Sequence, residues 1–281
     1  MKRFFTFLFS AAVSLTSSTT ATAQTVTVPY NPDGDANGLI GVTDLQDLLS
    51  TYGGAFAPGA IVVDSIELGE VLASLQAQIS AFRCGDNVLH EGYWYNTTAI
   101  GGQCWFAENV RYLPEVSPST AASGGQYPDA YVYGYQGTDV SEAQNTLEYH
   151  QFGALYNFPA VEQWNLCPEG WHVPTDLEWT EMTNSLGSEN YAGNLMKMKF
   201  GDDWDGTNLR GFSGLPGGYR TFNGYFDFAG FSGYWWSSSL DSLAGNGDVW
   251  YRSLSVNAEV VDRDSYGARY GFSVRCVRDA E

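Results

Sequence analysis

The sequence predicts an exported protein of the α+β class, in which a short N-terminal segment precedes one larger domain. Three observations support this prediction: a basic and then apolar N-terminus, a single Asp-rich loop followed by a helix, and a long remainder rich in Gly, Tyr and Trp. That remainder, residues 84–281, has short alternating runs of apolar and polar side chains between turns. The pattern predicts short antiparallel strands, one or two helices and long loops.

The acidic composition restricts the classes of partner. The chain has 32 Asp and Glu against 13 Lys and Arg, which is a formal net charge of −19. Nucleic acids and anionic lipid surfaces attract cationic proteins, so this charge argues against both. It suits a soluble exported protein, and it suits the binding of calcium.

Residues 1–23 are predicted to be a signal peptide. Lys2 and Arg3 precede the mainly apolar stretch "FFTFLFSAAVSL", and the small residues "ATA" end at Ala23. This is the order of a secretory signal and its cleavage site. The apolar stretch is shorter than the about 20 residues that a membrane-spanning helix needs, and no later stretch approaches that length. We therefore expect a secreted or cell-surface protein without a membrane span.

Residues 24–58 contain the Asp-rich loop "DGDANGLIGVTD" and the helical pattern "TDLQDLLSTYGG". Oxygen ligands at every second position surround a hard cation, so the loop predicts a structural calcium ion. The predicted ligands are Asp33, Asp35, Asn37, the carbonyl of Leu39, and Asp44. The loop and helix resemble one repeat of a dockerin module, although dockerins carry two such repeats. The alternative is a turn that caps the helix without metal.

Residues 59–83 are predicted to be a helical linker or a short coiled coil. The apolar positions follow the 4, 3, 4, 3 spacing of a coiled-coil seam and are Leu68, Leu72, Leu75, Ile79 and Phe82. Two interpretations stay open. The helix forms a homo-oligomer through residues 65–82, or it lies against its own domain.

The four cysteines, Cys84, Cys104, Cys167 and Cys276, are an even set in an exported chain, which predicts two disulfides. Three pairings are possible. We favour Cys84–Cys104, which closes a short hairpin, and Cys167–Cys276, which joins the middle of the domain to its last strand.

Local patterns place several elements of the large domain. "GYWYNTTAIGGQCWFAENV" predicts two strands around "IGG", and "DVWYRSLSVNAEVV" and "RYGFSVRCVRD" predict two more. Thr175 and Glu178 form a capping box that begins a helix with the apolar stripe Leu177, Met182 and Leu186. "YAGNLMKMKF" is compatible with a second helix.

The stretch "GYWWSSS", residues 233–239, places two tryptophans side by side in the sequence. In a strand, Tyr234 and Trp236 face one side, and Trp235 and Ser237 the other. The two tryptophans therefore cannot form one flat platform. We expect one to pack in the core and at most the other to reach a ligand.

Six motifs of the large domain occur in an order that identifies a family: "IGGQCWFAENVRYL", "GALYNFPAV", "CPEGWHVPTDLEW", "GFSGLPGGYR", "GYWWSSS" and "GFSVRCVRD". Through them the chain resembles the Fibrobacter succinogenes major paralogous domain over about residues 84–281. The resemblance implies a C-type lectin-like fold, in which the first and last strands meet and a long loop region occupies one face. It also implies that Cys167–Cys276 is similar to the long-range disulfide of that fold.

The segment 246–270 is the predicted ligand-binding surface. It combines rigid aromatic side chains, guanidinium donors and short polar groups, a mixture typical of adaptable binding surfaces. The predicted ligand-binding residues, with one tryptophan added from "GYWWSSS", are Trp235, Trp250, Asn257, Asp262, Arg263, Tyr266 and Arg269. The alternative is the solvent-exposed face of an antiparallel sheet, which alternates in the same way.

The sequence favours a non-enzymatic surface or extracellular binding and adhesion protein, with an unknown protein or glycan ligand at the cell exterior. His90, His150 and His172 lack metal-binding spacing, and the serines after Trp236 lack a hydrolase motif. The first alternative is a carbohydrate-binding accessory of polysaccharide degradation, although the Glu-Pro-Asn and Trp-Asn-Asp motifs of calcium-dependent sugar lectins are missing. A lesser alternative is a formylglycine-generating-type oxidase, which shares the fold but needs a reactive cysteine pair.

Overall fold

The computed structural model describes residues 62–63, 66–67, 82–121 and 126–279, which fall into two units. In the first unit, residues 1–81, strands β1 (Val62–Val63) and β2 (Ile66–Glu67) pair antiparallel. The predicted helical linker over 59–83 is therefore wrong at these residues. Val62, Val63 and Ile66 are β-branched, which favours strand over helix.

The second unit, residues 82–281, contains the rest of the described structure. Phe82, expected to end a coiled-coil seam, packs here instead. Its ring lies edge-on to Trp171 with centroids 5.4 Å apart, and the guanidinium of Arg278 lies 4.8 Å from its centroid. The other seam positions, from Leu68 to Ile79, lie outside the described residues.

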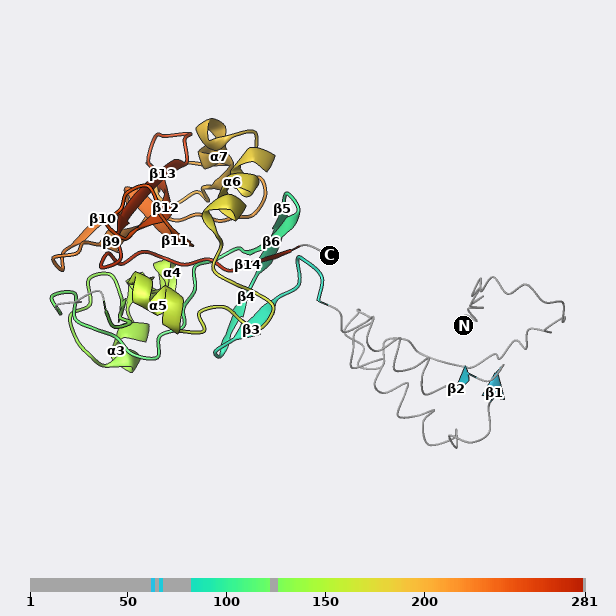
Figure 1. The fold of residues 1–281 in the computed structure, drawn as a ribbon, viewed down its shortest axis with the longest axis horizontal. Coiled ribbons are helices and arrows are strands. Elements are labelled where there is room, and N and C mark those ends of the chain that lie inside the picture. Colours follow the sequence, from blue (N-terminus) through green and yellow to red (C-terminus); the bar gives the residue numbers. More distant parts are fainter. Residues whose placement is uncertain (1–61, 64–65, 68–81, 122–125, 280–281) are drawn as a thin grey trace, which may run out of the picture. The chain divides into compact units, whose positions relative to one another are not determined.

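A five-stranded sheet organises the second unit (Figure 1). Its order is β10-β9-β11-β12-β13, with β11 parallel to β9 and antiparallel to β12, so β10 and β13 are the edges. Its strands are β9 (Gly217–Arg220), β10 (Phe226–Ala229), β11 (Ser232–Leu240), β12 (Asp248–Ser255) and β13 (Asp262–Gly267).

A three-stranded sheet joins the two ends of the unit. Strands β5 (Thr97–Ile100) and β6 (Gln103–Phe106) form the hairpin predicted around "IGG", and β14 (Val277–Asp279) pairs antiparallel with β6. Gly101 turns the hairpin with a φ of +65°, a conformation that glycine adopts without strain. Two smaller antiparallel pairs are β3 (Val88–His90) with β4 (Tyr93–Tyr95), and β7 (Ala130–Tyr131) with β8 (Leu155–Tyr156).

The helices among the described residues are α3 (Val140–Gln144), α4 (Leu147–Phe152), α5 (Phe158–Gln163), α6 (Asp176–Ser185) and α7 (Glu189–Met196). The capping box predicted for α6 is present, with Thr175 as N-cap and Glu178 as its partner. The predicted apolar stripe is wrong at Leu177, which is exposed, whereas Trp179 and Met182 are buried.

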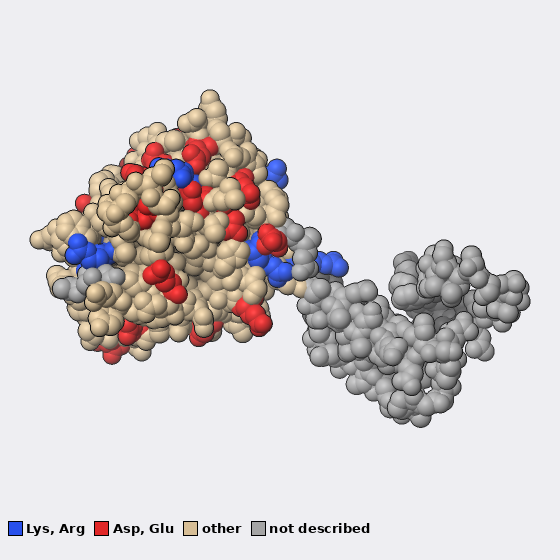
Figure 2. Space-filling view, viewed as in Figure 1, with Lys and Arg blue, Asp and Glu red and all other residues tan. Residues whose placement is uncertain are grey.

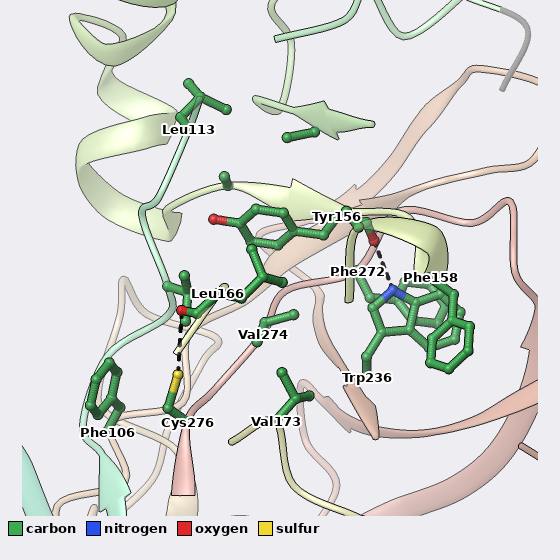
Figure 3. Packing of buried hydrophobic residues seen from close by; sticks show 14 of the residues in the cluster. Phe106, Leu113, Tyr156, Phe158, Leu166, Val173, Trp236, Phe272, Val274 and Cys276 are labelled. Atoms are coloured by element: carbon green, nitrogen blue, oxygen red, sulfur yellow. Dashed lines mark hydrogen bonds between the residues drawn. The ribbon is translucent and has the colours of Figure 1, made fainter. Parts of the chain in front are cut away.

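Two cores lie on opposite faces of the five-stranded sheet, and each takes one of the adjacent tryptophans. Trp236 packs with residues of α4 and α5, and its indole N–H donates to the carbonyl of Tyr156 at 2.7 Å (Figure 3). Trp235 packs with residues of α6 and α7, and its indole N–H donates to Asn109 Oδ1 at 2.8 Å. The predicted alternation along "GYWWSSS" is confirmed, but neither indole is free to reach a ligand.

Both favoured disulfides are present. Cys84–Cys104 spans 20 residues and Cys167–Cys276 spans 109 residues. Cys276 is fully buried, and its Sγ lies 3.6 Å from the carbonyl oxygen of Leu166 (Figure 3). In the chain-entropy account, such links stabilise a fold by about 3–5 kcal/mol, and more for the longer loop.

Candidate functional site

The five-stranded sheet carries a connected row of aromatic rings on the face that also holds Trp236. We call this the aromatic face. Each of the five strands contributes one ring, and one more comes from the segment after β13. They are Tyr219, Phe228, Tyr234, Tyr251, Tyr266 and Tyr270.

Strand register places these rings together. Tyr251 on β12 is opposite Trp236 on β11 and Asp264 on β13, and residues opposite each other in an antiparallel pair share a face. Tyr266 is two residues from Asp264, so it lies on the same side. Tyr219 on β9 joins the row through its contact with Tyr234, whose ring centroid is 4.7 Å away.

Each ring contacts the next one across the sheet, from β11 to the segment after β13. Centroids are 5.9 Å apart for Tyr234 and Tyr251, 5.2 Å for Tyr251 and Tyr266, and 4.6 Å for Tyr266 and Tyr270. Tyr251 is the inner member, with 5% of its surface exposed, whereas Tyr266 is 36% exposed at the edge strand. The row therefore runs from the core to the surface, and its rings are held in place by one another.

A buried arginine holds the end of the row. The guanidinium of Arg220 on β9 donates hydrogen bonds to the carbonyls of Ser119, Ala121 and Arg269, at distances from 2.6 to 3.1 Å. Because Arg269 precedes Tyr270, the hydrogen bond to the Arg269 carbonyl fixes the backbone beside the Tyr270 ring. Burial lowers the pKa of Arg220, yet the carbonyl oxygens satisfy its donors.

Three carboxylates accompany the rings: Asp227 opposite Tyr219, and Asp262 and Asp264 on the edge strand β13. All three are exposed. Within the described residues, none of them takes part in an ion pair. The aromatic face is therefore a hydrophobic surface with a negative rim.

The environment of the face shifts several pKa values. Burial, and then the neighbouring hydroxyl of Tyr234, raises the pKa of Tyr219 to about 12. Burial, with Asp264 next, raises the pKa of Tyr251 well above its usual range. Partial desolvation, and then the repulsion of Asp264, raises the pKa of the exposed Asp262. The hydroxyls therefore keep their protons near neutral pH and can donate hydrogen bonds, and Asp262 is a destabilised carboxylate.

The opposite side of the sheet, which we call the α6 face, carries charges that are paired. The guanidinium of Arg263 donates to both carboxylate oxygens of Asp176, at 2.9 and 2.8 Å, and lies 3.6 Å from the ring centroid of Trp250. Arg252, which is fully buried, donates to the same carboxylate at 2.8 Å and to Thr180 at 2.9 Å. This group fastens β12 and β13 to the first turn of α6.

A hollow of about 310 Å³ beside the Cys167–Cys276 disulfide is a second candidate; its lining includes Trp164, Trp171, His172 and Ser238. His172 Nε2 lies 2.6 Å from Glu178. Glu178 also accepts hydrogen bonds from the backbone and hydroxyl of Thr175, as the cap of α6 requires. His172, the titratable side chain of the hollow, is thus engaged with the carboxylate that caps the helix.

The structure divides the predicted ligand-binding residues. Trp235 is 1% exposed, which removes it from any binding surface because α6 and α7 cover its side of the sheet. Trp250 and Arg263 lie on the α6 face, where Arg263 is engaged with Asp176. Asp262 and Tyr266 lie on the aromatic face.

The other two predicted residues lie outside both faces. Asn257 occupies the turn after β12 with a φ of +55°, and the guanidinium of Arg269 lies 5.6 Å from the ring centroid of Phe222. Sequence reasoning missed the remaining residues of the site, which are Tyr219, Asp227, Phe228, Tyr234, Tyr251, Asp264 and Tyr270. The alternation "DRDSYG" was the one local signal, because it places Asp264 on the side of Asp262 and Tyr266.

The predicted calcium ligands, from Asp33 to Asp44, and the predicted signal peptide lie outside the described residues. Within the described part of the chain, no group of three or more His, Cys, Asp or Glu side chains could hold a metal ion. No described helix has the length and apolar composition needed to cross a bilayer.

Comparison with protein families identifies the larger unit. Residues 98–278 match the Fibrobacter succinogenes major domain, which is more than half of the chain. The chain belongs to this family. The match begins in β5 and ends in β14, so the Fibrobacter succinogenes major domain of this chain includes the whole aromatic face. Comparisons with curated proteins and with solved structures find no match.

Proposed function

We propose that the chain is an exported, non-enzymatic binding protein whose aromatic face holds a ligand at the cell exterior. One observation carries the proposal: partly exposed rings, fixed by mutual contact on a sheet, lie beside carboxylates that have no ion-pair partner within the described residues. Rings that are already ordered lose little conformational entropy on binding, which favours affinity.

Further exposed aromatic side chains extend the surface next to the rings. One is Phe222, whose ring centroid lies 5.7 Å from that of Tyr270, and Tyr225 and Phe231 are exposed on either side of β10 in the chain. Large exposed apolar patches on soluble proteins commonly mark interaction sites. Figure 2 shows the other relevant property, which is that acidic side chains outnumber basic ones over the visible surface of the unit.

Export is supported by the two disulfides, because such bonds persist mainly in oxidising compartments. The signal peptide at residues 1–23 is part of the proposal, as is a structural calcium ion held between Asp33 and Asp44. Calcium is tested by calorimetry and by the melting temperature of the full chain in calcium and in chelator. Absence of both binding and a thermal shift would remove the metal from the proposal.

We also propose that the larger unit has the C-type lectin-like fold. Two features support it: the last strand, β14, pairs with β6 from the N-terminal part of the unit, and Cys167–Cys276 ties the segment before α6 to the residue that precedes β14. An experimental structure of the chain tests the assignment by its strand order and disulfide positions.

A binding role is better supported than catalysis. The oxidase alternative needs a reactive cysteine pair, but Cys276 is buried in a disulfide with Cys167, and Cys84 is bonded to Cys104. His172 does not support a serine hydrolase with histidine as its general base, since its Nε2 contacts the helix-capping Glu178. The four cysteines and His172 therefore do not supply the groups of a catalytic site.

The test is a pair of arrays, one of glycans and one of peptides, probed with the full-length chain in calcium and in chelator. The wild type is compared with Tyr266→Ser on the aromatic face and with Tyr191→Ser, an exposed tyrosine on α7. We expect array signals that Tyr266→Ser lowers at least about tenfold and Tyr191→Ser leaves unchanged, because about 1.4 kcal/mol of lost contact corresponds to tenfold.

Signals that survive Tyr266→Ser would contradict the use of the aromatic face. Signals confined to the glycan array would establish the carbohydrate-binding alternative in place of protein adhesion. Circular dichroism and the melting temperature of both variants control for loss of fold.

A further inference from the structure

The carboxylates of the aromatic face are held by the protein only weakly. The carboxylates of Asp227 and Asp264 accept hydrogen bonds from the backbone N–H of the following residues, Phe228 and Ser265, at 2.9 and 2.8 Å. Asp262 accepts none from the described residues. The negative charge at the edge of the sheet is therefore not neutralised by the described part of the chain.

The arginines of the same sheet are engaged elsewhere. Arg252 and Arg263 share Asp176 on the α6 face, and Arg220 donates to backbone carbonyls. Arg269 follows β13, and its guanidinium lies over the ring of Phe222 beside Tyr270, at the end of the row. The chain thus leaves its edge carboxylates available while it pairs the carboxylate of Asp176 twice.

Tyr251 gives an independent indication of a ligand. Its side chain is more than nine-tenths buried, but its hydroxyl, which bonds no described residue, keeps contact with solvent. The hydroxyl interacts electrostatically first with Asp264 and then with Tyr266, so it lies toward the acidic rim. The hydroxyl is therefore free to exchange water for a hydrogen bond to a polar group bound at the rim.

We propose that the aromatic face binds the positively charged side chains of a basic peptide segment of a partner protein. The Lys or Arg heads would lie between the tyrosine rings and the carboxylates of Asp227, Asp262 and Asp264. This inference rests on the binding function proposed above and names its ligand class.

The chemistry of the face selects a cation over a neutral sugar. A cation over an aromatic ring gains about 0.5–2 kcal/mol, and each carboxylate adds a charge-assisted hydrogen bond. Asp262 and Asp264 repel each other, since they are two residues apart on one side of β13. A bound cation relieves this repulsion, whereas a neutral sugar leaves it in place.

Recognition uses side chains and not strand addition. The backbone N–H of Ser265 on the edge strand already donates to the carboxylate of Asp264. A partner strand would have to displace that bond, and charged edge residues disfavour such pairing. An extended basic segment that crosses the rings avoids this conflict.

The experiment is calorimetric titration of the full-length chain with hexalysine, hexaglutamine, hexaglutamate and cellohexaose. We expect hexalysine alone to bind, and its affinity to fall at least about tenfold between 50 and 300 mM salt because salt screens exposed charges. The double variant Asp262→Asn/Asp264→Asn should lose at least about tenfold in affinity for hexalysine. Absence of hexalysine binding, or equal binding of hexaglutamine, would overturn the inference.

The matched control is Asp202→Asn/Asp203→Asn, which removes the same charge from an exposed turn. Hexalysine should bind this variant as it binds the wild type. If both double variants weaken binding equally, the attraction is a property of net charge, and the inference fails.

The outcomes separate this inference from the proposed function. An array ligand that is lost in Tyr266→Ser but is unaffected by salt and by Asp262→Asn/Asp264→Asn overturns the cationic ligand and leaves the binding face intact. An array ligand that Tyr266→Ser does not affect overturns both.

Discussion

The two faces of the five-stranded sheet are built from the same strands, yet they treat charge in opposite ways. On the α6 face, Arg252 and Arg263 converge on Asp176 within 2.9 Å. On the aromatic face, Asp262 and Asp264 have no ion-pair partner within the described residues. A charge that the fold needs is paired and partly buried, whereas a charge left unpaired at the rim is available to a partner. The comparison therefore separates structural charges from binding charges on one sheet.

The largest expected effect is the loss of stability when either tryptophan is replaced. The two indoles are buried on opposite faces of the sheet. Trp235→Ala and Trp236→Ala should each lower the free energy of unfolding by about 3–5 kcal/mol, because each leaves a cavity in a closed core. Urea unfolding measures the loss, with the exposed Phe231→Ala as control. A loss for one tryptophan only would show that the other side of the sheet is not a core.

The next effect tests the paired charges. Asp176→Asn removes the carboxylate that faces the fully buried Arg252, and an unpaired buried charge costs about 3–5 kcal/mol. We expect a loss of about 3 kcal/mol in urea unfolding, at the lower end of that range, because Thr180 still accepts one hydrogen bond from Arg252 and Glu189 Oε1 lies 3.5 Å from its Nη2. A change below about 0.5 kcal/mol, as expected for the exposed Asp202→Asn, would contradict a structural role for this group.

Acidification should affect the two faces with opposite signs. Burial would raise the pKa of Asp176, but hydrogen bonds from Arg263 and Arg252 outweigh it, so the pKa falls below the usual 3.8. The stabilisation by Asp176 is therefore present above pH 3.8 and is lost as the pH falls through the lower, folded value. The pKa of Asp262 is raised above 3.8 by burial and by Asp264, with the Tyr251 and Tyr234 hydroxyls beside it.

For Asp262 the sign is reversed. The folded state binds its proton at a higher pH than the unfolded state does, so Asp262 destabilises the fold near neutral pH and ceases to do so as the pH falls through its folded value. Both contributions are measured from the free energy of unfolding of the wild type, Asp176→Asn and Asp262→Asn between pH 7 and 3. The difference at Asp262→Asn should disappear at a higher pH than the difference at Asp176→Asn. The reverse order would contradict the lowered pKa of Asp176 and the raised pKa of Asp262.

The smallest expected effect is on stability at neutral pH. Asp262→Asn removes the repulsion from Asp264 and should stabilise the fold by about 0.2–0.5 kcal/mol, while it weakens binding of hexalysine. Chemical unfolding and calorimetry of the same sample measure the two changes. A stability gain with unchanged binding would show that this carboxylate is not part of the site.

Several local features followed from the sequence because neighbouring residues are sufficient to form them. The capping box of α6 needs only Thr175 and Glu178, which are three residues apart. The alternation along "GYWWSSS" needs only an extended backbone. The disulfide preference also agreed with the structure, although it rested on elements far apart in the chain.

The candidate site could be predicted only in part, since its residues meet through strand register. Tyr219 and Tyr266 come from strands on opposite sides of β11 and β12, and no spacing in the chain connects them. Arg263 was assigned to ligand binding because its guanidinium offers hydrogen-bond donors within a segment of aromatic and short polar residues. Its partner Asp176 is 87 residues away, and that pairing is visible only once α6 packs on the sheet.

The residues alone therefore establish family membership, the helix start and which side chains of a strand share a side, because each depends on short-range geometry or on motifs preserved in order. Which side becomes core and which becomes surface was decided by the packing of helices on the sheet. That packing buried both Trp235 and Trp236 and left Tyr266 with Asp262 and Asp264 at an open edge. The reason is physical: alternation divides a strand into two sets, but only the elements that cover each set determine its solvent, its charge partners and its availability to a ligand.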